Sequence, residues 1–225
     1  MKLSPNTLNI LKNFATIQPE LVINPGSVIK TISAAKNIMA EASVAETFDK
    51  QLGIRDLNEF LNVYTLLEDP ADIEFGDNDI EVKSGTSKVS LRLFAIEMLT
   101  TPPAKNIEID KDVIVNLTEA QIGAIRAASS ALGNDIEYTS FVGDGKKISL
   151  VVNDCSGKNA NKLEIDLEQP TNLTFNLCVK TAEIKVLSGD YDVILSKKLI
   201  SKWVNKSDAV TYYIALDANH SSFNE

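Results

Sequence analysis

The side chains of this chain best placed to do chemistry are two isolated cations, Lys12 and Arg126. Lys12 lies in Ser4–Ile17, where apolar residues recur at helical spacing and the opposite side carries one cation, no acid and several uncharged polar groups. Arg126 lies in a second segment of this kind, Glu119–Leu132. A sparse cation among uncharged polar groups suits loose attraction to phosphate, and ordinary solvated surface charge is the alternative.

The overall charge opposes a nucleic-acid partner unless the cations gather on one surface. The chain has 225 residues and a formal net charge of -9, and 44% of its residues are hydrophobic. Such a composition fills a globular core. No apolar run approaches the roughly 20 residues that span a bilayer, so no membrane partner is expected. The start, MKLSPN, lacks the apolar segment of a secretory signal, and we therefore expect a cytosolic protein.

Catalytic and metal-binding patterns are weak. The single histidine, His220, is expected to be inert, and Cys155 and Cys178 are expected to be reduced thiols. The sequence GDGKK at 143–147 lacks the Gly-Lys-Ser/Thr ending of a phosphate loop and lies between two strands, so it predicts a hairpin turn. No His, Cys and Asp spacing fits a metal site. We expect no catalytic residue, no metal and no cofactor.

The elements that position the two cations recur in two halves. A helix, four strands, a second helix and three strands are predicted twice in the same order, although residue identity between the halves is low. In the first half the helices are Ser4–Ile17 and Leu57–Leu67, and the strands are Leu21–Asn24, Ser27–Ile32, Asn37–Ser43, Phe48–Ile54, Asp72–Phe75, Asp79–Lys83 and Ser87–Ala95. In the second half, after a strand at Asp112–Leu117, the helices are Glu119–Leu132 and about Lys180–Leu187, and the strands are Asp135–Val142, Lys147–Asn153, Lys162–Leu167, Asn172–Val179, Asp190–Ser196, Leu199–Asn205 and Val210–Asp217.

The strands alternate apolar and polar residues, so each sheet has one buried and one solvated face. The two helices of each half are the available cover for the buried face. Between the halves, Met98–Asp110 contains Pro102-Pro103 and no clear periodicity, which is typical of a connector. The predicted domains are therefore 1–97 and 111–225, joined by the connector 98–110, and the fold class is α+β.

Three segments in this order resemble one protein family: MKLSPNTLNILKNFATI, IRDLNEFLNVYTLLEDPADIEF and SGDYDVIL followed by TYYIALDAN. The family is the sliding clamp, or polymerase processivity factor, of T-even-type bacteriophages. The resemblance implies the DNA clamp fold, with two similar domains of two helices on antiparallel sheet, closing as a homotrimer into a ring. It further implies duplex DNA in the central channel, the phage DNA polymerase, an ATP-driven clamp loader and late-transcription factors as partners. It implies the cytoplasm of the infected host, and a clamp that hydrolyses nothing.

The resemblance also assigns roles to residues. DNA contacts fall to Lys12 and Arg126, and to Lys180 and Lys185 of the predicted fourth helix. Ring closure would pair strand Ser87–Ala95 of one copy with Lys162–Leu167 of the next. The charges that would face each other there are Lys88 and Arg92 on one strand, and Glu164 and Asp166 on the other. Solvated strand faces are the alternative explanation.

Partners of clamps insert a short apolar tail into a pocket beside the connector. Met98, Leu99, Pro102 and Tyr213 are the candidates for this pocket, and ordinary packing of a loop on a sheet is the alternative. A structural component of a phage particle is the second functional hypothesis, because such proteins are also acidic, rich in β-strands and oligomeric. The doubled helix-and-sheet plan favours the clamp.

Overall fold

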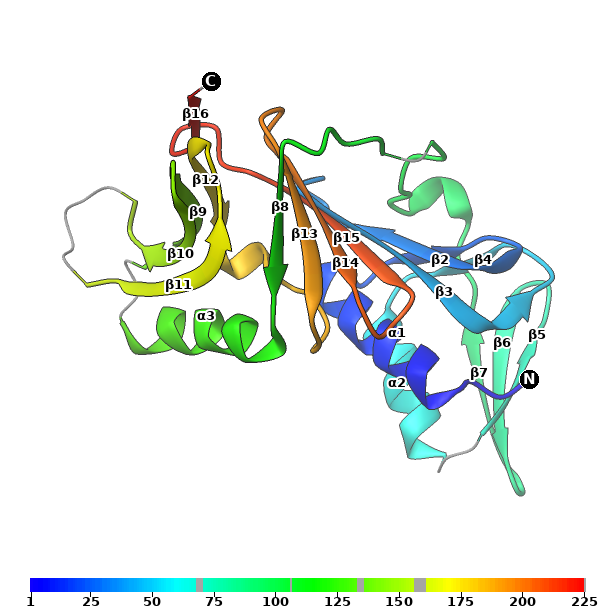
Figure 1. The fold of residues 1–225 in the computed structure, drawn as a ribbon. Helices are drawn as coiled ribbons and strands as arrows, with labels where there is room; N and C mark the ends of the chain where they lie inside the picture. Colours follow the sequence, from blue (N-terminus) through cyan, green and yellow to red (C-terminus); the bar gives the residue numbers. More distant parts are fainter. Residues whose placement is uncertain (68–70, 106, 133–135, 156–160, 225) are drawn as a thin grey trace. The chain divides into compact units, whose positions relative to one another are not determined.

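The chain divides into two units, Met1–Lys105 and Asn106–Glu225, and each is described by itself. Their architecture comes from a computed structural model, which describes residues 1–67, 71–105, 107–132, 136–155 and 161–224 (Figure 1). Within these residues, helices and antiparallel strands alternate along the chain, so the predicted α+β class is confirmed. The division falls within the predicted connector.

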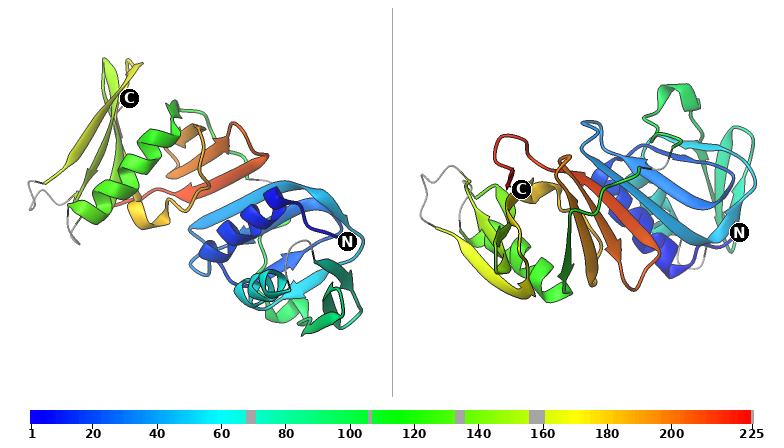
Figure 2. Two further views of the ribbon diagram at one scale, coloured as in Figure 1. Left: turned by 90° about the horizontal axis from the view of Figure 1, so that it is seen from below. Right: turned by 45° about the horizontal axis from the view of Figure 1, so that its top comes forward.

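Unit 1 places two helices against a sheet. Its elements are α1 (Pro5–Ile17), β1 (Leu21–Ile23), β2 (Gly26–Ile32), β3 (Ile38–Phe48), β4 (Leu52–Ile54), α2 (Leu57–Leu66), β5 (Asp72–Phe75), β6 (Asp79–Ser84), β7 (Ser87–Arg92) and the 3-10 helix η1 (Ile96–Met98). Strands β4-β1-β2-β3 form one antiparallel run and β5-β6-β7 another. Helix α1 packs against β2, β3 and α2, and Figure 2 (left) shows it lying along one face of the sheet.

Helix α1 begins where the sequence predicts. The Ser4 hydroxyl accepts a hydrogen bond from the backbone N–H of Thr7, and Pro5 occupies the first helical position. The helix buries one stripe of side chains at helical spacing: Thr7, Ile10, Leu11, Phe14 and Ile17. Each fully buried Leu, Ile or Phe contributes about 1.5–3 kcal/mol, so this stripe fixes which face of the helix remains outside.

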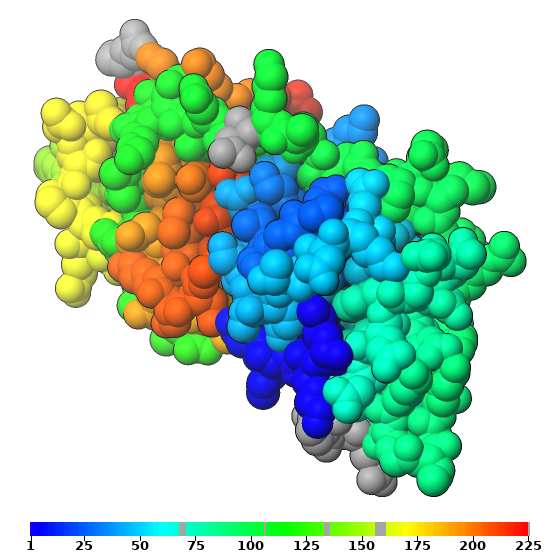
Figure 3. All heavy atoms as spheres, turned by 90° about the vertical axis from the view of Figure 1, so that its right-hand side faces the viewer, coloured from blue at the N-terminus to red at the C-terminus, as the bar shows by residue number. Residues whose placement is uncertain are grey.

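A buried carboxylate ties the start of α1 to the sheet. Glu46 of β3 is only 8% exposed and accepts hydrogen bonds from the Ser4 N–H and the Thr7 hydroxyl. Burial of the carboxyl group raises its pKa, but the hydrogen bonds from Thr7 and Ser4 outweigh burial, and the net pKa is lowered. The segment before α1 is also anchored, because Met1 and Ile73 exchange backbone hydrogen bonds; Figure 3 shows these first residues, in dark blue, against strands β5–β7.

Unit 2 repeats the plan with changes. Its elements are β8 (Val113–Leu117), α3 (Glu119–Ala131), β9 (Tyr138–Asp144), β10 (Lys147–Asn153), β11 (Leu163–Pro170), β12 (Thr174–Lys180), the 3-10 helix η2 (Thr181–Glu183), β13 (Tyr191–Ser196), β14 (Ile200–Asn205), β15 (Val210–Ala215) and β16 (Ser222–Asn224). Strands β15-β14-β13-β8 form one run, and β11-β10-β9-β12-β16 form a five-stranded sheet. Helix α3 contacts β10, β11 and η2. Asp135, where the sequence predicts the start of a strand, lies outside the described residues.

The predicted helix at Lys180–Leu187 is wrong, so the described part of unit 2 has one α-helix in place of two. Only the 3-10 turn Thr181–Glu183 forms there. Backbone groups of this segment bond to tertiary partners: the Thr181 N–H donates to the Glu137 carbonyl, and the Leu187 N–H donates to the Tyr212 hydroxyl. These tertiary bonds replace the hydrogen bonds between successive turns that an α-helix would need.

Several strand predictions also need correction. Sequence predicts a break between Ser43 and Phe48, but β3 runs through it with alternating burial, because the polar Glu46 points inward and is satisfied by the start of α1. The C-terminal strand β16 was not predicted, and it pairs with β12. The predicted strand Phe48–Ile54 is shortened to β4, Leu52–Ile54, and the predicted strand Ser87–Ala95 ends at Arg92, whereas β5 and β10 match residue for residue.

The Glu46 anchor yields a prediction about stability. Glu46→Gln should lower the free energy of unfolding by about 2 kcal/mol at neutral pH, because two hydrogen bonds to a charged acceptor are weakened. Since the folded-state pKa lies below the ordinary value of 4.5, this contribution is present above pH 4.5 and is lost as the pH falls through the folded-state value. Urea unfolding of both proteins should therefore show a difference that narrows in acid.

Glu41→Gln is the matched control, since Glu41 lies on the same strand in a half-exposed ion pair with Lys30. It should cost less than about 1 kcal/mol. A Glu46→Gln deficit that is as large at pH 3 as at pH 7 would show that the carboxylate charge does not contribute.

Candidate functional site

The outer face of α1 is as poor in charge as the sequence predicts. Lys12 is exposed, and the face around it is formed by Asn6, Asn9, Asn13 and Thr16. The last turn is satisfied locally, because the Thr16 hydroxyl donates to the Asn13 carbonyl. The helix carries no acid, so the field of Lys12 is not cancelled by a neighbour on its own helix.

The outer face of α3 repeats this arrangement in unit 2. Thr118 begins the helix with a capping box to Gln121, and Ile122, Ile125 and Ala128 are buried. Arg126 lies on the exposed face, among small residues. Both helices have 13 residues, and each cation lies seven residues after the first, so Lys12 and Arg126 occupy equivalent helix positions.

Arg126 has a structural contact as well. One guanidinium N–H donates to the Val186 carbonyl at 2.6 Å, which ties α3 to the segment after η2. A guanidinium has five N–H donors, so this bond uses only part of its capacity. The space above Gly123 on this helix is open, since a Cβ atom added there would meet nothing within 4 Å.

The remaining predicted cations are not on a helix. Lys180 is the last residue of β12 and is exposed, whereas Lys185 is half-buried in the irregular segment after η2. Helix α2 presents Asn58, Glu59, Asn62 and Thr65 outward and no cation. The helical cations of the described residues at this site are thus Lys12 and Arg126.

The two strands predicted to close a ring are both edge strands. Among the described residues of each unit, β7 pairs only with β6, and β11 pairs only with β10. Lys88, Arg92, Glu164 and Asp166 are all exposed. Lys88 also pairs with Glu81, Glu164 with Lys162 at 2.7 Å and Asp166 with Lys147 at 2.5 Å. The predicted charges therefore lie at free edges, and Lys88, Glu164 and Asp166 already have local partners.

The four candidates for a partner pocket are not alike. Met98 is 76% exposed, whereas Leu99 is buried. The Leu99 side chain lies over Gly53 of β4. A larger residue does not fit at Gly53, because an added Cβ atom would lie 2.3 Å from the Phe94 carbonyl oxygen. Leu99 therefore anchors the chain after β7. Tyr213 belongs to unit 2 and is buried, with Lys202 Nζ 5.5 Å from its ring centroid.

Pro102 lines a groove in unit 1. The groove has a volume of about 500 Å³ and combines residues of the connector with residues of β1, β2 and the β3–β4 turn. Its lining includes Val22, Lys30, Ile96, Pro102 and Pro103. The structure thus places an apolar groove with one cation beside the connector.

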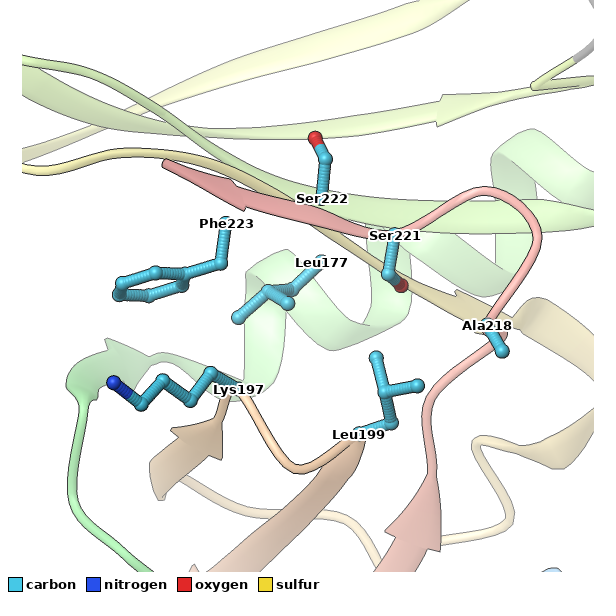
Figure 4. A pocket seen from close by; sticks show the side chains of 7 residues that line it. All are labelled: Leu177, Lys197, Leu199, Ala218, Ser221, Ser222 and Phe223. Carbon is cyan, nitrogen blue, oxygen red and sulfur yellow. The ribbon is translucent and has the colours of Figure 1, made fainter. Parts of the chain in front are cut away.

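The sequence does not predict a second pocket, which lies in unit 2. It has a volume of about 340 Å³ and is lined by Leu177, Lys197, Leu199, Ala218, Ser221, Ser222 and Phe223 (Figure 4). In Figure 4 the side chains of Leu177 and Leu199 point into the space between the C-terminal strand and the turn that carries Lys197 and Leu199. Only the alternation in Ser222-Phe223-Asn224 hints at this strand in the sequence, and its partner β12 is far away along the chain.

The C-terminal segment is ordered by contacts around His220. The His220 Nδ1 lies 2.9 Å from Asp217 Oδ1, and its ring lies 4.6 Å from that of Tyr138.

The thiols of Cys155 and Cys178 are free, but their sulfur atoms are 3.2 Å apart. The sequence did not indicate this proximity, because β9 lies between the strands that carry them.

The prediction for residues 143–147 is confirmed. Residues 143–147 form the β9–β10 hairpin turn, as predicted, with Asp144 Oδ1 accepting from the N–H groups of Lys146 and Lys147. In the part of the chain that the structure describes, no three His, Cys, Asp or Glu side chains gather as metal ligands. No helix there is long and apolar enough to cross a membrane.

Comparison with known proteins gives consistent matches. The family described as DNA polymerase processivity factor matches residues 2–97. The sliding clamp of Vibrio phage KVP40 is 29% identical over 97% of this chain and 100% of its own length, and that of Escherichia phage RB69 is 29% identical over 97% and 98%. The A. fulgidus PCNA bound to the C-terminal region of FEN-1 shares the fold, with a TM-score of 0.71, 12% identity and coverage of 93% of this chain and 94% of that one.

These matches support neither a component of a phage particle nor another fold. The predicted clamp fold is confirmed. This chain is thus similar over almost its whole length to the sliding clamps of T-even-type bacteriophages, and over residues 2–97 to the DNA polymerase processivity factors.

Proposed function

We propose that three copies of this processivity clamp close into a ring around duplex DNA and hold the phage DNA polymerase on its template. The observation that carries this proposal is the repeated cation: each half presents one, at the same position of a 13-residue helix, in a chain of net charge -9. Three copies would line the channel with Lys12 and Arg126, and add Lys180 and Lys185 near it.

This arrangement suits a ring that moves along DNA. Attraction to phosphate is independent of base sequence, whereas many tight contacts would fix the protein at one position. Uncharged Asn and Thr groups on α1 and small residues on α3 surround the cations. Such a surface attracts the backbone without presenting side chains for reading base edges.

The edge strands support closure. On β7, Val89 and Leu91 alternate with exposed residues as core positions do, yet both stay half-exposed. On β11, Leu163 and Ile165 behave in the same way. Pairing β7 of one copy with β11 of the next would bury these side chains and complete both edges.

The remaining partners follow from this ring. An ATP-driven loader opens and closes it, late-transcription factors share it with the polymerase, and the clamp itself catalyses no reaction. It acts in the cytoplasm of the infected host. The groove beside Pro102 offers an apolar lining for a partner's C-terminal tail, and Met98 stands exposed in the same connector region.

The first test concerns the channel cations. Lys12→Gln with Arg126→Gln should lower loader-dependent polymerase stimulation on a long primed template several-fold near physiological salt and flatten its dependence on salt, because phosphate contacts are lost. Because Gln is two heavy atoms shorter than Arg, the substitution at Arg126 also removes the hydrogen bond to the Val186 carbonyl, so Lys12→Gln alone should show the same direction of change without that loss. Product length should be measured across a series of salt concentrations.

Lys50→Gln with Lys206→Gln is the matched control. Both lysines are off the helices, in ion pairs with Asp77 and Asp192, and the double variant changes the net charge equally. If this control lowers stimulation as much as the helix variant, the effect is one of net charge, and the channel assignment is wrong.

The second test concerns ring closure. Arg92→Glu should shift the assembly from trimer toward monomer, because it places like charges opposite Glu164 and Asp166 of the next copy. Adding Glu164→Arg to the same chain should restore the trimer. Light scattering coupled to size exclusion measures both, and Lys50→Glu serves as the control. An intact trimer in Arg92→Glu would refute this pairing of edges.

The third test concerns partner docking at the connector. Met98→Ser should weaken binding of a C-terminal peptide of the phage DNA polymerase about tenfold, as expected for losing the burial of an apolar side chain. Leu66→Ser is the control, because Leu66 is similarly exposed, at 73%, and lies on α2 of the same unit. Calorimetric titration should separate them. Equal loss in both variants would argue against docking at the connector.

A further inference from the structure

A polar cluster in unit 2 contains both cysteines of the chain and is not explained by the clamp function. Cys178 lies on β12 with its thiol fully buried, in register with Ser140 of β9. Cys155 follows the end of β10 and is half-buried. Their sulfur atoms are 3.2 Å apart, and the Ser140 hydroxyl lies 2.8 Å from the sulfur of Cys178 and 3.5 Å from that of Cys155.

The backbone holds Cys155 in this place. Its φ is 50°, in the left-handed region that residues other than glycine rarely adopt. Asn153 Oδ1 accepts from the Cys155 N–H at 3.2 Å and also lies 3.2 Å from its sulfur. The chain thus turns so that the Cys155 side chain faces Cys178.

We infer that Cys155 and Cys178 form a dithiol–disulfide site whose substrate is a small-molecule disulfide of the glutathione type. A disulfide has an S–S bond of about 2.0 Å, so the two sulfur atoms need to approach by only about 1.2 Å. The unequal exposure of the two thiols assigns the order of events: Cys155 reacts first, and Cys178, which an external disulfide does not reach, resolves the intermediate.

The reaction balances in two exchanges. The Cys155 thiolate attacks one sulfur of oxidised glutathione, which forms a mixed disulfide and releases one glutathione thiolate. Cys178 loses its proton and attacks the Cys155 sulfur, which forms the protein disulfide and releases the second glutathione thiolate. The two thiol protons pass through solvent to the released thiolates. Two protein thiols are oxidised, and one glutathione disulfide is reduced to two thiols.

The electrostatics of the cluster suit these roles. The hydrogen bond from the Cys178 thiol lowers the pKa of Cys155 to about 7; burial opposes this shift, as does the charge of Asp154, while Ser140 and His220 assist it. The pKa of Cys178 is raised by the same hydrogen bond and by burial. Near neutral pH the nucleophilic thiolate is therefore on Cys155.

The test uses the reduced full-length chain at low concentration with oxidised glutathione as the probe. We expect the loss of two hydrogen atoms from the intact mass, a non-reducing peptide map that links Cys155 to Cys178, and reversal by dithiothreitol. Cys178→Ser should stop at one glutathione adduct, and Cys155→Ser should react far more slowly. Wild-type chain that carries glutathione without the linked peptides, or that stays reduced where Cys178→Ser is modified, overturns the inference.

A second measurement needs no variant. Diluting a glutathione buffer about tenfold at a fixed ratio of oxidised to reduced form should raise the ratio of disulfide to dithiol about tenfold, because two thiols are released for each disulfide consumed. A mixed disulfide releases only one, so its ratio would not change. A ratio that is insensitive to dilution contradicts the intramolecular bond. This test does not require ring closure or DNA, so it stands apart from the proposed function.

Discussion

The site depends on one constraint, which is that an acidic chain must keep its phosphate-attracting cations away from its own carboxylates. Amphipathic packing meets this constraint. The apolar stripes of α1 and α3 each bury one face of a helix, and this determines that Lys12 and Arg126 point outward among uncharged groups. Since effective charge falls with nearby opposite charge, the composition of the helix faces matters more than the net charge of -9. Hydrophobic burial thus sets the electrostatics of the proposed DNA surface.

The two halves satisfy the same plan with different contacts. In unit 1 the start of α1 is held by the buried carboxylate of Glu46 on β3. In unit 2 the capping box of Thr118 and Gln121 is local, and the tertiary contact is made by Arg126 on the Val186 carbonyl. The second helix of unit 2 is absent from the segment that Arg126 contacts. Arg126 therefore combines a charge at the surface with a structural bond, whereas Lys12 is positioned by the packing of its helix.

What the sequence predicts correctly is what short-range patterns determine. The cap at Ser4, the position of Lys12 and the bounds of β5 follow from spacing within a few residues. The errors arise where distant partners decide. Tyr212 and Glu137 take the backbone bonds that would make a helix after Lys180, and the start of α1 satisfies a carboxylate within β3. The contact between Cys155 and Cys178 depends likewise on the pairing of β9 with both β10 and β12.

The two edge strands, β7 and β11, leave apolar side chains half-exposed in the folded protomer. On β6, Ile80 and Val82 are 2% and 0% exposed, yet Leu91 and Val89, which face them directly in register on β7, stay half-exposed. On β10, Leu150 and Val152 are fully buried, and their partners Ile165 and Leu163 on β11 are not. At both edges the apolar side chains of the last strand are more exposed than those of the strand beside it, although the alternation of apolar and polar residues continues. A further strand at each edge would extend the buried layer to these residues, and a ring of identical copies supplies one strand to each edge without leaving an end.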